Sequence, residues 1–312
     1  MGEVLTGTAS WTDKTLLNSG WYPATADNAE ERLKYYAEHF PLVEVDSSYY
    51  GLPSERTAVL WAERTPDDFT FDFKAFRLFT GHPTPVDKLP KDARENLPTN
   101  LRGKTTLYSS DLPKELLDRV WDMYRSALMP VYRAGKLGAV FLQYPKWFYF
   151  SRDNMRRIED AAGHLPDYQV AVEFRTPSWM NERNATATLN FLRERGIAYT
   201  SVDEPQGTSA SVPPVAAATT ANLAVVRFHG RRTETWDKRG VGVEERFKYF
   251  YEDTELAEWV PKIRNLQEET RQVHALMNNC YADYGVRNAR QLELLLQESG
   301  VPVALPGHHS GA

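Results

Sequence analysis

Short runs of β-branched and aromatic residues alternate along the chain with longer stretches whose hydrophobic positions recur at helical spacing. This alternation is typical of βα units, in which helices join parallel strands. We predict strands at residues 5–10, 42–46, 70–74, 139–144, 169–174, 198–203, 223–229 and 272–278. We predict helices at residues 29–40, 54–64, 114–133, 152–162, 185–195, 256–270 and 288–298.

Eight strands with interleaved helices favour a closed, TIM-like (β/α)8 barrel over an open sheet, and 312 residues suffice for one such barrel with insertions. Two connections break the rhythm. A polar insertion follows strand three, between Phe76 and Asp111, and an irregular crossover without a helical face follows strand six at residues 204–221. We expect a single domain over residues 1–305 and a frayed tail over 306–312, which includes His308 and His309.

Side chains alternate between the two faces of a strand, so residues two apart share a face. On four strands the charged residues share one face and the apolar residues the other; the charged pairs are Glu44 with Asp46, Asp72 with Lys74, Glu173 with Arg175, and Arg227 with His229. Thr6, Thr8 and Ser10 share a face of strand one, as do Ser201 and Asp203 of strand six. Helices cover the outside of a parallel barrel, so we expect the polar faces to line the lumen.

The expected lumenal set carries an excess of negative charge. Five acids face three bases, with His229 counted as neutral: Glu44, Asp46, Asp72, Glu173 and Asp203 against Lys74, Arg175 and Arg227. A cationic ligand group, protonated carboxyls or one Mg²⁺ or Mn²⁺ held by Glu44, Glu173 or Asp203 would offset this excess. The alternative is an ion-pair network that only fixes the barrel geometry, but charges on so many strands favour a site.

Composition and charge indicate which partners and which cellular compartment to expect. The formal net charge of −5 does not favour broad attraction to nucleic acid or to an anionic membrane. The only cysteine, Cys280, cannot form an intrachain disulfide, which suits a reducing compartment. The chain has no N-terminal signal-peptide pattern and no apolar stretch of about 20 residues that could span a bilayer. We therefore expect a cytoplasmic protein that does not bind a membrane.

Several segments, taken in order, resemble domain-of-unknown-function family 72, also called the YecE-like family. The matching segments are Gly7–Trp11, Trp21–Pro23, Val43–Tyr50 with Pro53, Phe71–Ala75, Phe141–Pro145, Glu173–Arg175 with Ser178 and Trp179, Arg227–Arg231, and Asn278 with Asn279. The resemblance covers nearly the whole chain and implies an α/β-barrel. It implies no reaction, because the activity of the family is itself unassigned.

The chain departs from the family pattern at three places. Asp46 stands where the family usually has Asn, Thr176 stands where His is common, and Gly81 separates Thr80 from His82. Only His229 among the seven histidines is placed at a predicted strand end. A multinuclear zinc site, which needs several His and carboxylate ligands, is therefore not favoured.

We predict an enzyme of hydrolase or lyase type that performs acid/base chemistry, with or without one divalent cation, on a small anionic sugar-like or nucleotide-like substrate. The candidate catalytic residues are Glu173, Glu44, Asp203, His229 and Lys74. The candidate ligand-binding residues are Arg175, Arg227, Gln143, Tyr50, Trp11, Trp179 and Asn278. Carboxylates around Lys74 favour an ion-paired amine over a Schiff-base nucleophile.

Two alternatives stay open. The first is a nucleic-acid-binding barrel that grips a strand with aromatic loops and with Arg231 and Arg232. The second is a sensor that binds a small ligand without turnover. The oligomeric state does not follow from the sequence.

Overall fold

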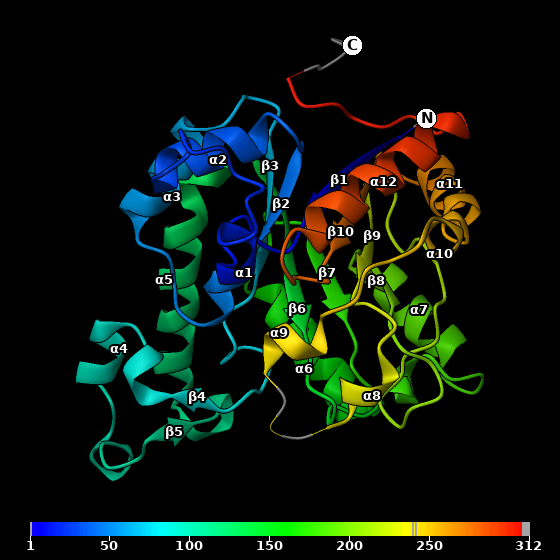
Figure 1. Cartoon of the computed structure of the whole chain (residues 1–312). Helices are drawn as coiled ribbons and strands as arrows, with labels where there is room; N and C mark the ends of the chain where they lie inside the picture. Colours follow the sequence, from blue (N-terminus) through cyan, green and yellow to red (C-terminus); the bar gives the residue numbers. More distant parts are fainter. Residues whose placement is uncertain (1, 239, 241, 308–312) are drawn as a thin grey trace.

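The computed structural model describes residues 2–238, 240 and 242–307. The barrel strands are β1 (Glu3–Thr8), β2 (Leu42–Val45), β3 (Thr70–Lys74), β6 (Leu137–Gln143), β7 (Val170–Glu173), β8 (Ala198–Asp203), β9 (Leu223–Phe228) and β10 (Gln272–Met277). They form a closed parallel barrel in the order β1, β10, β9, β8, β7, β6, β3, β2 (Figure 1). The predicted TIM-like barrel is confirmed.

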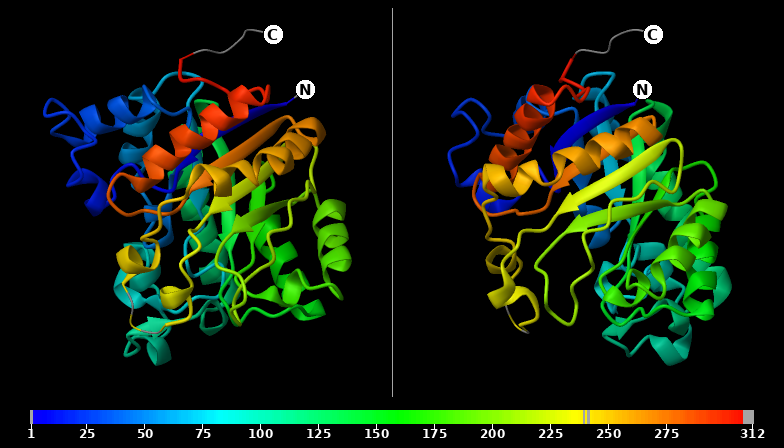
Figure 2. Two further views of the ribbon diagram at one scale, coloured as in Figure 1. Left: turned by 45° about the vertical axis from the view of Figure 1, so that its right-hand side comes forward. Right: turned by 90° about the vertical axis from the view of Figure 1, so that its right-hand side faces the viewer.

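Helices follow the strands on the outside of the barrel. The longer ones are α2 (Ala29–Ala37), α3 (Glu55–Glu63), α5 (Lys114–Arg133), α6 (Arg152–Gly163), α7 (Ala185–Glu194), α11 (Val260–Glu269) and α12 (Tyr284–Glu298). The short ones are α1 (Lys14–Leu17), α8 (Thr233–Trp236), α9 (Val243–Arg246) and α10 (Asp253–Ala257). Figure 2 shows α11 and α12 lying along the outside of β10 and β1.

Local sequence explains where several of these helices begin. The side chains of Asn28 and Ser151 accept hydrogen bonds from backbone N–H groups in the first turns of α2 and α6. The single helix predicted over residues 256–270 is divided into α10 and α11. Pro261 lies in the first turn of α11, where its missing N–H costs no helical hydrogen bond, so a new helix begins at Val260.

The core has two apolar layers, one outside the barrel strands and one inside the lumen. The first layer lies between the strands and the outer helices and includes Val43 and Val45. The second fills the lumen itself with Leu5, Leu42, Ala139, Phe141, Ala171, Ala198, Leu223, Val225 and Leu276. Glu44, Glu173 and Arg227 lie beyond this apolar plug, toward the carboxyl ends of their strands, whereas Asp72 lies deeper in the barrel.

An Asp–His pair crosses the lumen between β3 and β10. Asp72 accepts a hydrogen bond from the backbone N–H of Ala139 at 2.8 Å and lies 2.8 Å from Nδ1 of His274. The register of β3 against β6 shifts between Phe71 and Phe73, beside Gly138. A Cβ at Gly138 would come within 2.5 Å of the Asp72 carboxylate, so only glycine fits this bulge.

The expectation that Thr6, Thr8, Ser201 and Asp203 face the lumen is wrong. In the strand register, Ser201 and Asp203 lie beside Val226 and Phe228, which face the outer helices. Thr8 lies 2.9 Å from the hydroxyl of Tyr36 in α2, on the same outer side. Small hydroxyl-bearing residues therefore occur on either face of a strand, because a neighbouring helix can supply their hydrogen-bond partners.

Both predicted irregular connections are confirmed. The insertion after β3 contains α4 (Lys91–Glu95) and a small antiparallel pair, β4 (Thr84–Pro85) with β5 (Thr106–Leu107). Of residues 204–221, all of them described, none lies in a helix or strand. The insertion lies at the same end of the barrel as α8 and α9 (Figure 1).

The C-terminal segment returns to the first strand. Val303 forms a parallel bridge with Val4, and the backbone N–H of Ala304 donates to the carbonyl of Val4 at 2.9 Å. The division into one domain over residues 1–305 stays a prediction. Of the expected tail, Pro306 and Gly307 form a turn, while residues 308–312, with His308 and His309, lie outside the described residues.

Candidate active site at the barrel mouth

Arg227 organises the buried charges at the carboxyl end of the barrel. Its Nε and Nη2 atoms donate to both carboxylate oxygens of Glu44 at 2.7–3.0 Å, and its Nη1 donates to Oε2 of Glu173. The side chains of Glu44 and Glu173 are 0% exposed and that of Arg227 is 1% exposed. Alternation along β2, β7 and β9 directs all three side chains inward, as the sequence predicted, and the barrel closure brings them together.

Glu173 receives hydrogen bonds from four side chains. Besides Arg227, the donors to its Oε1 atom are Gln143 at 2.6 Å, His229 at 3.1 Å and Arg175 at 3.2 Å. Burial alone would raise the pKa of Glu173, but Arg227, His229 and Arg175 hold it well below its usual range. Glu173 is therefore a carboxylate at neutral pH that fixes the positions of its donors and is a weak base.

The hydrogen bonds around His229 define its tautomer. The amide nitrogen of Asn278 lies 2.8 Å from Nδ1, and because an amide nitrogen only donates, Nδ1 accepts. Burial lowers the pKa of His229 to about 3, although the carboxylate of Glu173 acts in the opposite direction. The ring is therefore neutral at pH 7 and donates its Nε2 proton to Glu173. Asn278 acts as a positioning residue.

Glu44 and Lys74 lie on the neighbouring strands β2 and β3, with Lys74 two residues beyond the register partner of Glu44. Burial raises the pKa of Glu44 to about 7, although Arg227 and Lys74 act to lower it. Lys74 Nζ lies 2.8 Å from Oδ1 of Asp46. Burial would lower the pKa of Lys74, but Asp46 and Glu44 raise it overall. The amine is thus a charged, ion-paired group, as expected from the surrounding carboxylates.

Glu204 belongs to this site, and sequence reasoning missed it. Its Oε1 accepts the backbone N–H of Val212 at 2.7 Å, while its buried Oε2 has no hydrogen-bond partner and lies 3.4 Å from Nη1 of Arg175. Burial raises the pKa of Glu204 to about 7. Its position in the sequence could have indicated this role, because Glu204 directly follows a strand at the end of the barrel where active sites of this fold lie.

Aromatic and cationic side chains surround the opening above this network. The ring of Tyr49 packs against Lys74 Nζ, 4.7 Å from the centroid, and against the guanidinium of Arg77 at 5.2 Å. His82 lies 5.3 Å from Tyr49 and 6.0 Å from Trp147, between ring centroids. Trp147 is 54% exposed and Tyr50 is 46% exposed, so both can contact a ligand. Sequence reasoning did not select Arg77 or His82 as site residues.

Two of the expected ligand-binding aromatic residues are packed into the protein instead. Trp11 lies against Trp61 and Phe71, on the helix-covered side of the barrel. Trp179 is fully buried, stacks on Phe174 and donates its indole N–H to the carbonyl of Phe148 at 2.6 Å. These tryptophans hold loops on the barrel and offer no free ring face at the mouth.

Asp203 lies outside the network. Its carboxylate accepts hydrogen bonds from the hydroxyl of Tyr251 and the indole N–H of Trp259, both at 2.6 Å, and pairs with Arg231 at 2.8 Å. Asp203 therefore leaves the expected lumenal set, in which Glu204 takes its place as the fifth acid. The placement of Asp203 separates it from Glu44 and Glu173.

The donor set does not fit a bound divalent cation. Glu44 and Glu173 both bond to Arg227, and Asp203 faces the other way. Among the residues that the structure describes, no group of three or more His, Cys, Asp or Glu side chains is arranged to hold a metal ion.

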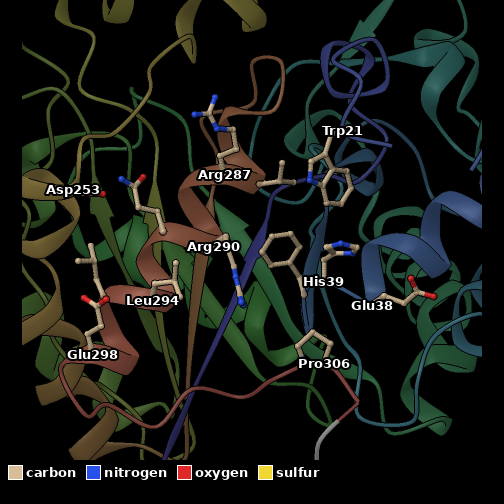
Figure 3. Close-up of a pocket in the computed structure, with 13 residues that line it drawn as sticks. Trp21, Glu38, His39, Asp253, Arg287, Arg290, Leu294, Glu298 and Pro306 are labelled. Carbon is tan, nitrogen blue, oxygen red and sulfur yellow. The ribbon is translucent and has the colours of Figure 1, made fainter. Parts of the chain in front are cut away.

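A cleft of about 760 Å³ lies away from the mouth, between α2 and α12 (Figure 3). Trp21, His39, Arg287 and Arg290 line it, and the two arginines are already paired with Asp283 and Glu293. None of the strand-end residues contributes to its lining. We place the candidate site at the mouth because buried charges and free cationic donors converge there.

The closed parallel barrel and the charge network at its carboxyl end define a TIM-like α/β-barrel protein with a polar network at the strand ends. The chain belongs to the DUF72 family, since a sequence model described as "Protein of unknown function DUF72" matches residues 5–309. Within the described part of the chain, no helix combines the length and the apolar character needed to cross a membrane.

Two relatives of the chain are proteins of Bacillus subtilis and Escherichia coli. The chain is 31% identical over 300 residues to the UPF0759 protein YunF of Bacillus subtilis strain 168, covering 95% of this chain and 96% of that protein. It is 27% identical over 168 residues to the UPF0759 protein YecE of Escherichia coli K12, covering 53% of this chain and 49% of that protein. Neither name states a reaction.

Solved structures of the family have the same fold. A DUF72 family protein from Thermotoga maritima MSB8 matches with a TM-score of 0.71 and 28% identity, covering 95% of this chain and 99% of that chain. Another from Enterococcus faecalis V583 matches with a TM-score of 0.72 and 22% identity, covering 95% and 98%.

Proposed function

We propose that the chain is an enzyme, of hydrolase or lyase type, that performs acid/base chemistry on a small anionic substrate with a sugar-like or nucleotide-like ring. The observation that carries this proposal is the buried carboxylate of Glu173, held by four side-chain donors beneath the partly exposed cations Lys74 and Arg175. This network presents Lys74 and Arg175 at the mouth, where their positive charge can stabilise negative charge that develops on a substrate.

We assign proton transfer to Glu204, with Glu44 as the second candidate. An acid/base group works best when its pKa lies near the operating pH, and burial raises the pKa of each to about 7. Glu44 is held by Nε and Nη2 of Arg227, whereas Oε2 of Glu204 is free of hydrogen bonds and lies beside Arg175. Movement of Arg175 toward an anion would release this oxygen to the substrate.

The remaining residues bind and orient. Lys74 and Arg175 attract the negative charge of the substrate, while Glu173 and His229 hold the network in place. Trp147 and Tyr50 offer exposed ring faces on which a planar ring or a sugar can stack. We place the enzyme in the cytoplasm, since a chain with one cysteine suits a reducing compartment.

The ion pairs of Arg231 and Arg232 weigh against the nucleic-acid alternative, which depended on these two arginines being available to a ligand. Arg231 is paired with Asp203, Glu255 and Glu258, and Arg232 is paired with Glu245. These arginines are therefore neutralised by neighbouring carboxylates. A sensor would bind its ligand and release it chemically unchanged, whereas an enzyme would convert it.

The proposal is tested by incubating the protein with a defined mixture of sugar phosphates, nucleotides and sugar acids in D₂O and following each compound by NMR. Chemical conversion or solvent-deuterium incorporation by the wild type is expected. In Glu204→Gln we expect the rate to fall by roughly 10²–10⁴-fold, the usual contribution of a general acid or base.

Glu268→Gln, which changes an exposed carboxylate of α11, serves as the matched control and should keep the wild-type rate. If Glu44→Gln abolishes turnover while Glu204→Gln does not, the proton-transfer role moves to Glu44. If a compound binds tightly and is recovered unchanged by every variant, the protein is a sensor and the enzyme proposal is wrong.

A further inference from the structure

Arg77 carries a charge that no described residue neutralises. It follows β3, and its guanidinium packs on the ring of Tyr49 without an ion pair to any described side chain. Its Nε–H is buried and has no hydrogen-bond partner. A buried donor on a charged group is rarely left unpaired, so this atom indicates a missing acceptor at the mouth.

Two further cations lie on the same opening. Lys74 contacts the same tyrosine ring as Arg77, at 4.7 Å from its centroid. The pKa of His82 is lowered to about 3, first by burial and then by the charges of Lys74, Arg77 and Arg175, so all three cations act on one point.

We propose that Arg77, together with Lys74 and Arg175, binds the phosphoryl group of a phosphate monoester. This inference rests on the proposed function and specifies the anionic group of its substrate. Arg77 supplies the unpaired donor, Lys74 a compact charge, and Arg175 a guanidinium that can turn from its carboxylate partners. The planar fork of a guanidinium matches two phosphate oxygens at once.

Charge favours a phosphate over a carboxylate. Asp46 partly offsets Lys74, and Glu173 and Glu204 partly offset Arg175, while Arg77 stays unmatched. A phosphate monoester carries close to two negative charges at neutral pH, so it can offset Arg77 together with the positive charge that remains on Lys74 and Arg175, whereas a carboxylate carries only one.

Isothermal titration with inorganic phosphate and with acetate at equal ionic strength tests this subsite. The wild type should bind phosphate at least tenfold more tightly than acetate. Arg77→Met should weaken the phosphate Kd at least tenfold, and Arg77→Lys should recover part of that loss. Arg133→Met removes an exposed positive charge at the end of α5, where the chain enters β6 at the opposite end of the barrel, and should bind phosphate like the wild type.

Modification of the wild-type protein avoids any dependence on how the variants fold. Phenylglyoxal reacts with accessible guanidinium groups, and the modified arginines are identified by mass spectrometry. Phosphate should protect Arg77 while leaving Arg133 reactive. Equal protection of both residues, or equal affinity for acetate and phosphate, would overturn the phosphate subsite.

The outcomes separate this inference from the proposed function. If turnover depends on Glu204 but Arg77→Met changes only the folding stability, the subsite is wrong and the enzyme stands. If phosphate binds through Arg77 but no compound is converted, the subsite stands and the acid/base proposal fails.

Discussion

Arg227 Nη2 lies 2.7 Å from Oε2 of Glu44, across the lumen between two strands that do not pair with each other. Both side chains are almost completely buried, and the same guanidinium also binds Glu173. Burying three charged groups is costly, so their mutual pairing decides whether the end of the barrel is stable.

Arg227→Met should therefore destabilise the protein strongly. It leaves two buried carboxylates without their common partner, and breaking a buried pair costs about 3–5 kcal/mol. Urea unfolding at pH 8, where both carboxyl groups are ionised in the unfolded chain, measures the effect. Arg133→Met, at an exposed position, should change the free energy of unfolding by less than about 1 kcal/mol. A similarly small loss for Arg227→Met would show that the network does not stabilise the barrel.

Ionisation of the Glu204 carboxyl group should lower the free energy of unfolding as the pH rises. Its pKa in the folded protein is raised to about 7, so between its unfolded value near 4.5 and pH 7 the folded state binds more protons than the unfolded state. Folding stability then falls with increasing pH, by roughly 1.4 kcal/mol per pH unit for one such group. His82 and His229, whose pKa values are lowered to about 3, act in the opposite direction up to pH 6.5.

For this reason the measured quantity is the difference between Glu204→Gln and the wild type, followed by urea unfolding from pH 4.5 to 7.5. The variant should gain stability relative to the wild type as the pH rises through this window. A difference that does not change with pH would mean that Glu204 is ionised throughout.

His229 should stay neutral and keep its proton on Nε2 from pH 8 down to about pH 4. Nitrogen chemical shifts of the imidazole ring report both the tautomer and the titration. Asn278→Val removes the donor to Nδ1, so the two neutral tautomers should become mixed while the protein remains folded. Detection of a cationic His229 ring at pH 6 would contradict the proposed hydrogen-bond directions.

Asp203→Asn should affect stability and leave ligand binding intact. The substitution weakens the pairing with Arg231 and the hydrogen bonds from Tyr251 and Trp259, with an expected cost of about 1–3 kcal/mol. Phosphate should still raise the melting temperature of this variant, whereas Lys74→Met should lose most of that response. Loss of the response in Asp203→Asn alone would return Asp203 to the site.

The barrel and most of the lumenal network could be predicted from the sequence. On β2, β7 and β9, charged residues alternate with large apolar ones, and only one face of such a strand can lie under helices. This alternation correctly predicts that the side chains of Glu44 and Arg227 face the lumen.

Other parts of the site depend on contacts distant in sequence. Asp203 follows the same alternation, but Tyr251 and Trp259, about 50 residues later, provide hydrogen bonds on the outer face. Thr8 is likewise held by Tyr36. Arg77 and Glu204 lie just beyond their strands, where alternation no longer indicates direction, so their roles follow only from the folded arrangement.

The pairing of β1 with β10 also affects how the protein is made. These two strands are about 270 residues apart in the chain, so β1 leaves the ribosome long before β10 has been synthesised. Until Met277 has emerged, the nascent sheet has an unpaired edge at β1 that can bind other extended chains. Production in cells should therefore respond to translation speed and to holdase chaperones more strongly than the equilibrium stability of the finished barrel would indicate.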